Sequence, residues 1–362
     1  MAPAPSRPSS PSAGPGLLTR LNTTFWALLD PWIFLSLSLS YLPQTIISLI
    51  RQRRFLALLG GPLLSDDFQS AWFGHFWSWA GPQVRSTAEV NVVPLLEGRV
   101  RNGEVVPKSE AHAPGVGGVV LEIGPGSGMW VSLFSDEKYL NSSSFPEEQG
   151  ETPEGEEGHE EEEGLSASWA TIPDDQKPHH RETRTTQKKT TTTAVGTRQR
   201  ITQVYGVEPN YGIHPLLQHN ITQAGLSQTY TILPFGIEDI ERYAPQIQPE
   251  SLDCIVSILC LCSIPEPQKN IGILYRYLKP GGRWFVYEHV KCCSNKPGGW
   301  FMSAYQAFVN LFWPLCLGGC QLRRDTARYL KEAGPWTDID LAQPPKEQWH
   351  QTVPHIYGIL TK

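Results

Sequence analysis

Val119-Val120-Leu121-Glu122-Ile123-Gly124-Pro125-Gly126-Ser127-Gly128 is the stretch of sequence that decides the fold. An apolar run ends in an acidic residue and passes directly into a turn with glycine at alternate positions. Glycine is needed where the chain turns tightly and where a Cβ would keep a ligand away from the backbone. Dinucleotide-binding turns have the related spacing Gly-x-Gly-x-x-Gly, which differs from the spacing here. The stretch predicts a strand, a ligand-binding turn and a helix in succession.

Further apolar runs and amphipathic segments alternate along the rest of the chain. Such alternation is typical of parallel strands joined by helices. We therefore expect an α/β fold with a doubly wound, mostly parallel seven-stranded sheet. The expected strands are 119–123, 203–208, 230–233, 252–258, 283–290, 337–341 and 355–361, and the amphipathic segments lie near 213–224 and 266–278.

The N-terminal region has the composition of a membrane anchor behind a disordered tail. Residues 1–24 begin with a tract of Pro, Ser, Ala and Gly and are expected to be disordered. Residues 25–54 are the predicted anchor, because no charged residue lies between Pro31 and Ile50, a length sufficient to cross hydrocarbon. Asp30 and Pro31 are expected at the N-cap and first position of its helix.

The geometry of the anchor stays open at this point. Pro43 allows a bent helix or a re-entrant hairpin as well as a straight span. A cleaved signal peptide is the competing interpretation, but a small-residue cleavage site is lacking and the basic run Arg51–Arg54 follows instead. These arginines predict that the following residues face the cytosol.

Residues 55–113 are expected to form a helical connector or cap between the anchor and the catalytic domain. Its aromatic cluster either packs over that domain or lies at the membrane interface; its members are Trp72, Phe73, Phe76, Trp77 and Trp79. The domain itself is expected to span residues 114–362. It is interrupted at 136–200 by a Glu/Gly tract and a basic Thr-rich tract, both of which should be disordered.

Charge and cysteine spacing argue against two classes of ligand. The formal net charge of −6 argues against a nucleic-acid partner. The spacings of the seven cysteines match no zinc framework, so no metal is expected. Protein partners cannot be inferred from the sequence.

A second candidate binding motif follows the strand expected at 203–208. Its sequence is Gly206-Val207-Glu208-Pro209-Asn210, with an acid placed where a carboxylate could grip the two hydroxyls of a ribose. Two simpler interpretations remain open. Glu208 could be an ordinary solvent-facing acid at a strand end, and Glu122 could cap a helix.

Four motifs in order resemble those of Rossmann-type S-adenosylmethionine-dependent methyltransferases: LEIGPGSG, YGVEPN, LDCIVSILCLCSI and LKPGGRWFVYEHV. More narrowly, the chain resembles the membrane-anchored methyltransferase-like alkyl-thiol methyltransferases. The apolar N-terminus, GGCQLRR (318–324) and PHIYGIL (354–360) carry that likeness. The resemblance implies the class I methyltransferase fold, S-adenosyl-L-methionine as cofactor, and attachment to endoplasmic reticulum or lipid droplets. Pro125 and the charged insertion depart from the family pattern.

Carried over residue by residue, the resemblance implies a cofactor site at the ends of several strands. The glycine loop would line the methionine and ribose end, the acid of the second motif would hold the ribose hydroxyls, and its neighbours would shape the adenine wall. The residues so assigned are Glu122, Gly124, Pro125, Gly126, Ser127, Gly128, Glu208, Pro209, Asn210, Ile237, Glu238 and Leu259.

The methyl acceptor is expected to be a small lipophilic molecule that arrives from membrane lipid, and a thiol is favoured. A thiol is partly ionised at neutral pH, whereas a carbon or hydroxyl acceptor needs a positioned base. His289 is the candidate catalytic base, or else a hydrogen-bonded structural histidine. Cys260 and Cys262 are nucleophiles or, alternatively, small core residues. A quinone- or sterol-type C-methyltransferase and a non-catalytic membrane-surface or lipid-droplet protein with the same fold are the alternatives.

Overall fold

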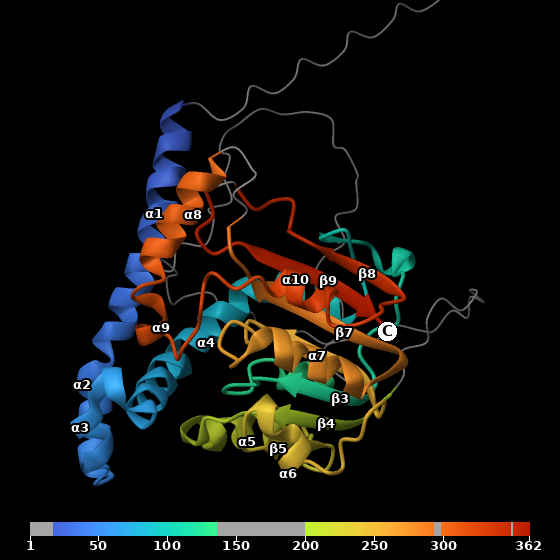
Figure 1. Ribbon diagram of the computed structural model, residues 1–362, viewed down its shortest axis with the longest axis horizontal. Helices are drawn as coiled ribbons and strands as arrows, with labels where there is room; N and C mark the ends of the chain where they lie inside the picture. Colours follow the sequence, from blue (N-terminus) through green and yellow to red (C-terminus); the bar gives the residue numbers. More distant parts are fainter. Residues whose placement is uncertain (1–16, 136–199, 293–297, 349) are drawn as a thin grey trace, which may run out of the picture.

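The structure, a computed structural model, describes residues 17–135, 200–292, 298–348 and 350–362 (Figure 1). The predicted disorder of residues 1–16 and of most of the charged insertion lies outside these residues.

The central element is a seven-stranded sheet with the order β5-β4-β3-β6-β7-β9-β8. Strand β9 pairs antiparallel with β7 and with β8, and the other pairings in the sheet are parallel. The predicted doubly wound, mostly parallel sheet is therefore confirmed. The strands are β3 (Gly118–Ile123), β4 (Ile201–Val207), β5 (Tyr230–Leu233), β6 (Leu252–Ile258), β7 (Leu278–His289), β8 (Asp338–Ala342) and β9 (His355–Thr361).

The strand order reverses at β3, which pairs with β4 on one side and β6 on the other. In open α/β sheets, ligands bind outside the carboxyl ends of the strands at such a switch point. The Gly124–Gly128 turn and the residues after β6 lie at this point.

Both faces of the sheet are buried under helices. Successive side chains of a strand point to opposite faces, so neighbouring residues belong to different cores. Val120 and Val256 belong to one core with helix α4 (Asp66–Leu96) and helix α5 (His214–Gln223). Leu121 and Ile255 belong to the other, with α6 (Ile240–Tyr243), α7 (Pro267–Tyr277) and α10 (Thr326–Lys331).

The N-terminal helices are α1 (Leu17–Ser40), α2 (Leu42–Arg51) and α3 (Phe55–Leu64). Residues 17–24 are thus helical, not disordered, and the expected helix start at Asp30 and Pro31 is wrong. Pro31 cannot donate to the carbonyl of Ala27, four residues earlier. The Thr352 hydroxyl donates to that carbonyl instead, at 3.3 Å, so the helix continues through the proline.

The chain bends at the second proline of the apolar segment. Helix α1 ends at Ser40, and Pro43 lies in the first turn of α2. This is the bent-helix alternative, not the hairpin. Residues 21–51 are long and apolar enough to cross a membrane by length and composition.

Helix α4 packs between α1 and the sheet. Trp72 and Phe76 are buried, and the Trp72 indole N–H donates to the carbonyl of Ser38 in α1 at 2.7 Å. Figure 1 shows α8 (Gly299–Val309) beside α1 on the same side of the molecule, with α9 (Trp313–Cys316) below it. Trp72 and Phe76 of the aromatic cluster therefore serve packing, whereas Trp79 is 37% exposed.

The helix expected after the glycine turn is absent from the described residues that follow β3. The chain forms a turn and the 3₁₀ helix η2 (Val131–Phe134) instead. Trp130, Val131, Leu133 and Phe134 are all buried, so this segment lacks the polar side of an amphipathic helix. A small hairpin, β1 (Val100–Arg101) with β2 (Glu104–Val105), follows α4.

Candidate functional site

One large cavity of about 1230 Å³ lies at the carboxyl ends of the parallel strands. It brings together residues from both predicted binding motifs and from the ends of β6 and β7. The predicted site residues that line it are Gly124, Gly126, Glu208, Pro209, Asn210, Ile237, Glu238, Leu259 and His289.

The glycine turn leaves the cavity open to the backbone. Gly124 and Gly126 have φ values of +62° and +56°, a conformation that side chains disfavour. A Cβ at Gly124 would lie 2.8 Å from Cβ of Cys260. A Cβ at Gly126 would point toward the Trp77 indole of α4, at 3.4 Å. The turn thus provides space that a flat or elongated ligand can occupy.

Glu208 connects the second motif to the glycine turn. Its Oε2 accepts a hydrogen bond from the N–H of Gly126 and its Oε1 one from the N–H of Asn210, each at 2.9 Å. Burial raises the pKa of Glu208, while these two N–H groups act in the opposite direction. A carboxylate has about four lone-pair sites, so both oxygens can still accept from a ligand diol.

Glu122 lies beneath the turn and not on the cavity wall. Its carboxylate accepts a hydrogen bond from the Tyr230 hydroxyl of β5 at 2.5 Å. Burial raises the pKa of Glu122 to about 7. Gly206 lies on β4, between β3 with Glu122 and β5 with Tyr230, and a Cβ there would collide with the Tyr230 ring. Tyr230 is thus a supporting residue that the sequence did not reveal, and Gly206 of the second motif makes room for its ring.

Pro125, Ser127 and Gly128 also lie off the cavity wall. The Ser127 carbonyl accepts from the Asn220 side chain of α5 at 2.7 Å, and the Pro125 carbonyl accepts from the N–H of Gly128. These residues shape the turn and attach it to α5.

Helix α4 closes the cavity over the binding motifs. The Asn210 amide donates to the carbonyl of Ser70 at 3.0 Å, which attaches the second motif to this helix. Phe73 and Trp77 stack with ring centroids 5.2 Å apart, and both line the cavity.

The segment after β6 is held by Glu288, a fully buried acid of β7 whose role the sequence did not reveal. Its carboxylate accepts from the N–H groups of Cys260 and Leu261, each at 3.1 Å. Leu259 has φ +55°, and its N–H donates to the carbonyl of Tyr287 at 2.8 Å. A non-glycine residue in this region of φ is strained and is held there by its surroundings. The position of this acid in the YEHV motif was the available signal.

His289 ends β7 and lines the cavity, as its candidate role requires. Its Nε2 lies 3.2 Å from Sγ of Cys320, and its Nδ1 has no hydrogen-bond partner among the described residues. A contact with Cys320 and burial raise the pKa of the Cys262 thiol well above its usual value. Burial and the carboxylate of Glu288 do the same for Cys260. Neither thiol is therefore a ready nucleophile.

The far end of the cavity reaches the N-terminal helix. Ala27, Pro31 and Phe34 of α1 line it together with Trp313 and Leu317. The sequence predicts an anchor separate from the catalytic domain. The structure places one face of this helix in the wall of the site.

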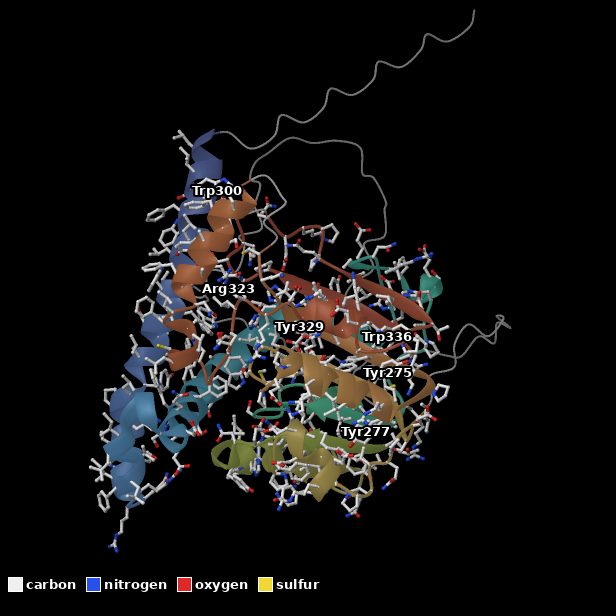
Figure 2. All side chains as sticks on the ribbon, in the orientation of Figure 1. Tyr275, Tyr277, Trp300, Arg323, Tyr329 and Trp336 are labelled. Carbon is white, nitrogen blue, oxygen red and sulfur yellow. The ribbon has the colours of Figure 1, made fainter. Side chains whose placement is uncertain are left out.

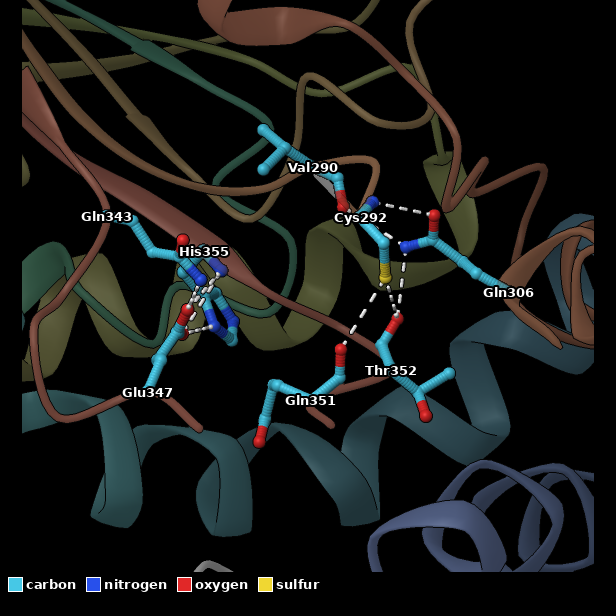
Figure 3. Close-up of polar contacts among 8 residues, drawn as sticks. All are labelled: Val290, Cys292, Gln306, Gln343, Glu347, Gln351, Thr352 and His355. Carbon is cyan, nitrogen blue, oxygen red and sulfur yellow. Dashed lines mark hydrogen bonds and ion pairs between the residues drawn. The ribbon is translucent and has the colours of Figure 1, made fainter. Parts of the chain in front are cut away.

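A polar network secures α8 against the rim of the cavity (Figure 3). The Gln306 side chain accepts from the N–H of Cys292 at 2.9 Å and donates to the carbonyls of Val290 and Thr352. The amide oxygen and the amide nitrogen of Gln306 both bond to backbone groups, which fixes α8 relative to the end of β7. Figure 3 also shows Glu347 bound to His355, at 2.6 Å, on another part of the cavity wall.

Comparison with known proteins identifies a shared domain. A family model described as a methyltransferase domain matches residues 104–334. The thiol S-methyltransferase TMT1B of Rattus norvegicus is 34% identical over 118 residues, which cover 32% of this chain and 46% of that protein. The thiol S-methyltransferase TMT1A of Homo sapiens is 32% identical over 120 residues, with the same coverage. The match thus spans about half the length of these curated relatives.

Solved structures are more distant. An O-methyltransferase family protein from Burkholderia thailandensis aligns with a TM-score of 0.41 at 10% identity, over 82% of this chain and 59% of that one. An arsenic(III) S-adenosylmethionine methyltransferase from Chlamydomonas reinhardtii aligns with a TM-score of 0.36 at 13% identity, over 67% and 62%.

Proposed function

The chain belongs to the methyltransferase-domain family, and from this premise we propose that it transfers a methyl group from S-adenosylmethionine to a small lipophilic thiol at a membrane surface. The observation that carries the proposal is the continuity of the cavity. One end holds the glycine turn and Glu208, and the other is walled by the apolar N-terminal helix.

The cofactor end fits S-adenosylmethionine by its donor set and its space. The Glu208 carboxylate has free lone pairs for the ribose hydroxyls, and the positive-φ glycines admit the methionine part next to the backbone. Pro209, Asn210, Ile237 and Glu238 supply the wall for the adenine, as proposed from the family resemblance. The cofactor supplies a methyl group on a positively charged sulfur when it is bound.

The acceptor end fits an apolar molecule. Phe34, Trp313 and Leu317 line it, and the presence of α1 in its wall supports entry of the acceptor from surrounding lipid. Catalysis of methyl transfer is mostly alignment of donor and acceptor, to which an apolar chamber contributes by holding the acceptor in place. His289 is the polar group of the cavity wall at the end of β7, positioned to accept a proton or to orient the acceptor.

A thiol acceptor is supported by its acidity and by the names of the relatives. A thiol is partly ionised at neutral pH, whereas carbon and hydroxyl acceptors demand a positioned base. His289, the candidate base at the end of β7, is buried and contacts Cys320, without a carboxylate aligned behind it in the described residues. The curated proteins of similar sequence are named thiol S-methyltransferases.

Membrane attachment is supported by a broad apolar surface over the N-terminal helices and α8. Trp300, labelled in Figure 2, lies on α8 beside α1 with 73% of its surface exposed. Exposed apolar patches of this kind mark membrane or protein interaction sites. The exposed members are Leu18, Leu21, Phe25, Trp26, Ile46, Ile47, Ile50, Phe55, Leu56, Leu59, Trp300, Phe301, Phe308, Leu311 and Phe312. We propose endoplasmic reticulum or lipid droplets as the compartment, with the catalytic domain on the cytosolic side.

The test is a methyl-transfer screen with full-length protein in detergent micelles. S-adenosylmethionine labelled in its methyl group is offered with alkyl thiols, quinones and sterols as separate acceptors. Labelled methyl thioether from alkyl thiols supports the proposal. Label in a quinone or sterol but in no thiol contradicts it, and cofactor binding without any product indicates a non-catalytic protein.

A further inference from the structure

Cys262, His289 and Cys320 form a buried cluster that the cofactor site does not use. They come from three separate segments: the turn after β6, the end of β7, and the turn after α9. Their ligand atoms all lie within 4.8 Å of one another. We propose that these three side chains bind one Zn²⁺ ion whose open coordination position faces the acceptor end of the cavity.

The donor set suits a borderline-soft divalent metal. Two thiolates and one imidazole are ligands that zinc prefers. Tetrahedral zinc with its usual bond lengths places two sulfur ligands, or a sulfur and a nitrogen, about 3.5–3.8 Å apart. Nε2 of His289 and Sγ of Cys320 are already 3.2 Å apart, so rotations of the side chains suffice to open the site to that size.

The ligand atoms of the cluster are also oriented by their neighbours. The Trp313 indole N–H donates to Sγ of Cys320 at 3.2 Å, the kind of outer contact that positions and stabilises a metal-bound thiolate. Nε2 of His289 faces the thiol, whereas its buried Nδ1 has no partner in the described part of the chain. Nε2 is therefore the ligand atom.

Three protein ligands leave the fourth tetrahedral position free, as in catalytic zinc sites. Cys262, His289 and Cys320 all line the cavity, so this position opens into it. Two thiolates cancel the charge of the dication. A further sulfur ligand suits the open position, because thiolate and imidazole are the donors that zinc prefers.

The sulfur ligand at the open position would be the acceptor thiol, so this inference rests on the proposed function. An acceptor thiol that binds the metal loses its S–H bond, the proton goes to water, and a metal–sulfur bond forms. A lone pair of the same sulfur then forms the bond to the methyl carbon. The carbon–sulfonium bond of the donor breaks, and its electron pair leaves a neutral thioether on the donor.

The linear spacing of the cysteines predicted no zinc framework because the ligands are not close in sequence. The parallel sheet brings the ends of β6 and β7 to the same edge, and α9 returns the third ligand to it. The site is a product of topology and not of a local motif.

The experiment measures metal in full-length protein purified in detergent without chelators. Mass spectrometry of the metal content should give about one zinc per chain. Replacement by Co²⁺ should give a near-ultraviolet thiolate-to-cobalt band, which octanethiol should perturb. Cys262→Ser and Cys320→Ser should each lower the affinity for Co²⁺ at least tenfold. Cys254→Ser, which changes a buried cysteine of β6 outside the cavity wall, should retain the metal and the band.

Two results overturn the site. One is folded, cofactor-binding protein that takes up no more zinc or cobalt than the Cys262→Ser/Cys320→Ser double variant. The other is recovery of Cys262 and Cys320 as a disulfide from protein alkylated at lysis. Failure of the thiol function is distinguishable: metal bound at the three ligands without thiol methylation leaves the site intact and refutes the acceptor.

Discussion

The N–H of Gly126 donates a hydrogen bond to Oε2 of Glu208 at 2.9 Å, across 82 residues of sequence. The glycine turn and the second binding motif are therefore held together directly. The acid that is proposed to hold the ribose also holds the turn against which the methionine part lies. Because Oε1 of the same carboxylate accepts from Asn210, both oxygens serve the protein before any ligand arrives.

Glu208→Gln should weaken S-adenosylmethionine binding by about 1–3 kcal/mol, since charge-assisted bonds to the ribose are lost. The amide also removes one of the two acceptors for the N–H groups of Gly126 and Asn210. Glu208→Ala, which removes both acceptor oxygens, should weaken S-adenosylmethionine binding further. Calorimetry with full-length protein in detergent measures both affinities.

Gly126→Arg provides the matching steric test. A side chain at this φ of +56° points toward Trp77 and into the cavity, so binding should be abolished while the fold persists. Unchanged affinity in folded Glu208→Ala and Gly126→Arg protein would refute the cofactor site.

Glu122 predicts a pH dependence of stability. Its pKa is about 7 in the folded protein, mainly because of burial, against an ordinary value of 4.5. The folded state thus keeps a proton that the unfolded state has released, and stability falls as pH rises from about 4.5 to about 7. Glu122→Gln lacks this titration. Its free energy of unfolding relative to wild type should rise by about 2–3 kcal/mol across that interval.

Denaturant unfolding of both proteins at several pH values checks this expectation. Tyr230→Phe is the matched control, because the Tyr230 hydroxyl lowers the pKa of Glu122. Its loss should extend the decline of stability to higher pH. Parallel curves for wild type and Glu122→Gln would show that Glu122 does not titrate in this range.

Sequence predicted the sheet well because the strands carry their own signals. Apolar and β-branched residues give the expected segments 230–233, 252–258 and 355–361 the same bounds as β5, β6 and β9. Helix α1 was harder. The carbonyl that Pro31 leaves unpaired is satisfied by Thr352, a residue more than 300 positions away.

The candidate site was predictable where a local motif exists and not where contacts are long-range. Gly124, Gly126 and Glu208 follow from turn and strand-end chemistry. Glu288, which braces the turn after β6, and the joining of Cys262 to Cys320 depend on the order of the strands. No spacing rule along the chain contains that information.

Trp300→Ser combined with Leu311→Ser should weaken membrane attachment without loss of stability. The side chains of these two residues are 73% and 72% exposed, so polar replacements remove apolar area from the proposed membrane surface and little from the core. The wild-type protein should stay with membranes in alkaline carbonate, and the double variant should be partly released. Val105→Ser, at an exposed position of the β1–β2 hairpin, is the control. Recovery of the wild type in the high-speed supernatant would contradict the anchor itself.

Replacing residues 137–198 by a short Gly/Ser linker should change the melting temperature by only a few degrees. Phe134 before the insertion and Ile201 after it are buried in the domain, so both ends are already held. The composition of the segment between them cannot build a core. Loss of cooperative unfolding in a thermal scan would show that the insertion packs against the domain.

The acceptor itself should determine how the rate depends on pH. The attacking species is the thiolate, so the rate with subsaturating thiol should climb with pH to a plateau. If the thiol ionises free in the chamber, the midpoints for thiols of different acidity should follow their own pKa values. If it ionises on a metal held by Cys262, His289 and Cys320, the midpoints should lie lower and close together, because a coordinating thiol is deprotonated by the ion.

His289→Ala then separates the two roles of the histidine. As a general base, His289 contributes typically 10²–10⁴-fold, and its loss should slow weakly acidic thiols more than acidic ones, whose thiolate is already present. As a metal ligand, its loss should instead restore the dependence of the midpoint on the pKa of each thiol. Stopped assays with a series of alkyl and aryl thiols, run in parallel with Cys254→Ser, measure both effects. A rate that falls with rising pH for every thiol would mean that the thiolate is not the attacking species.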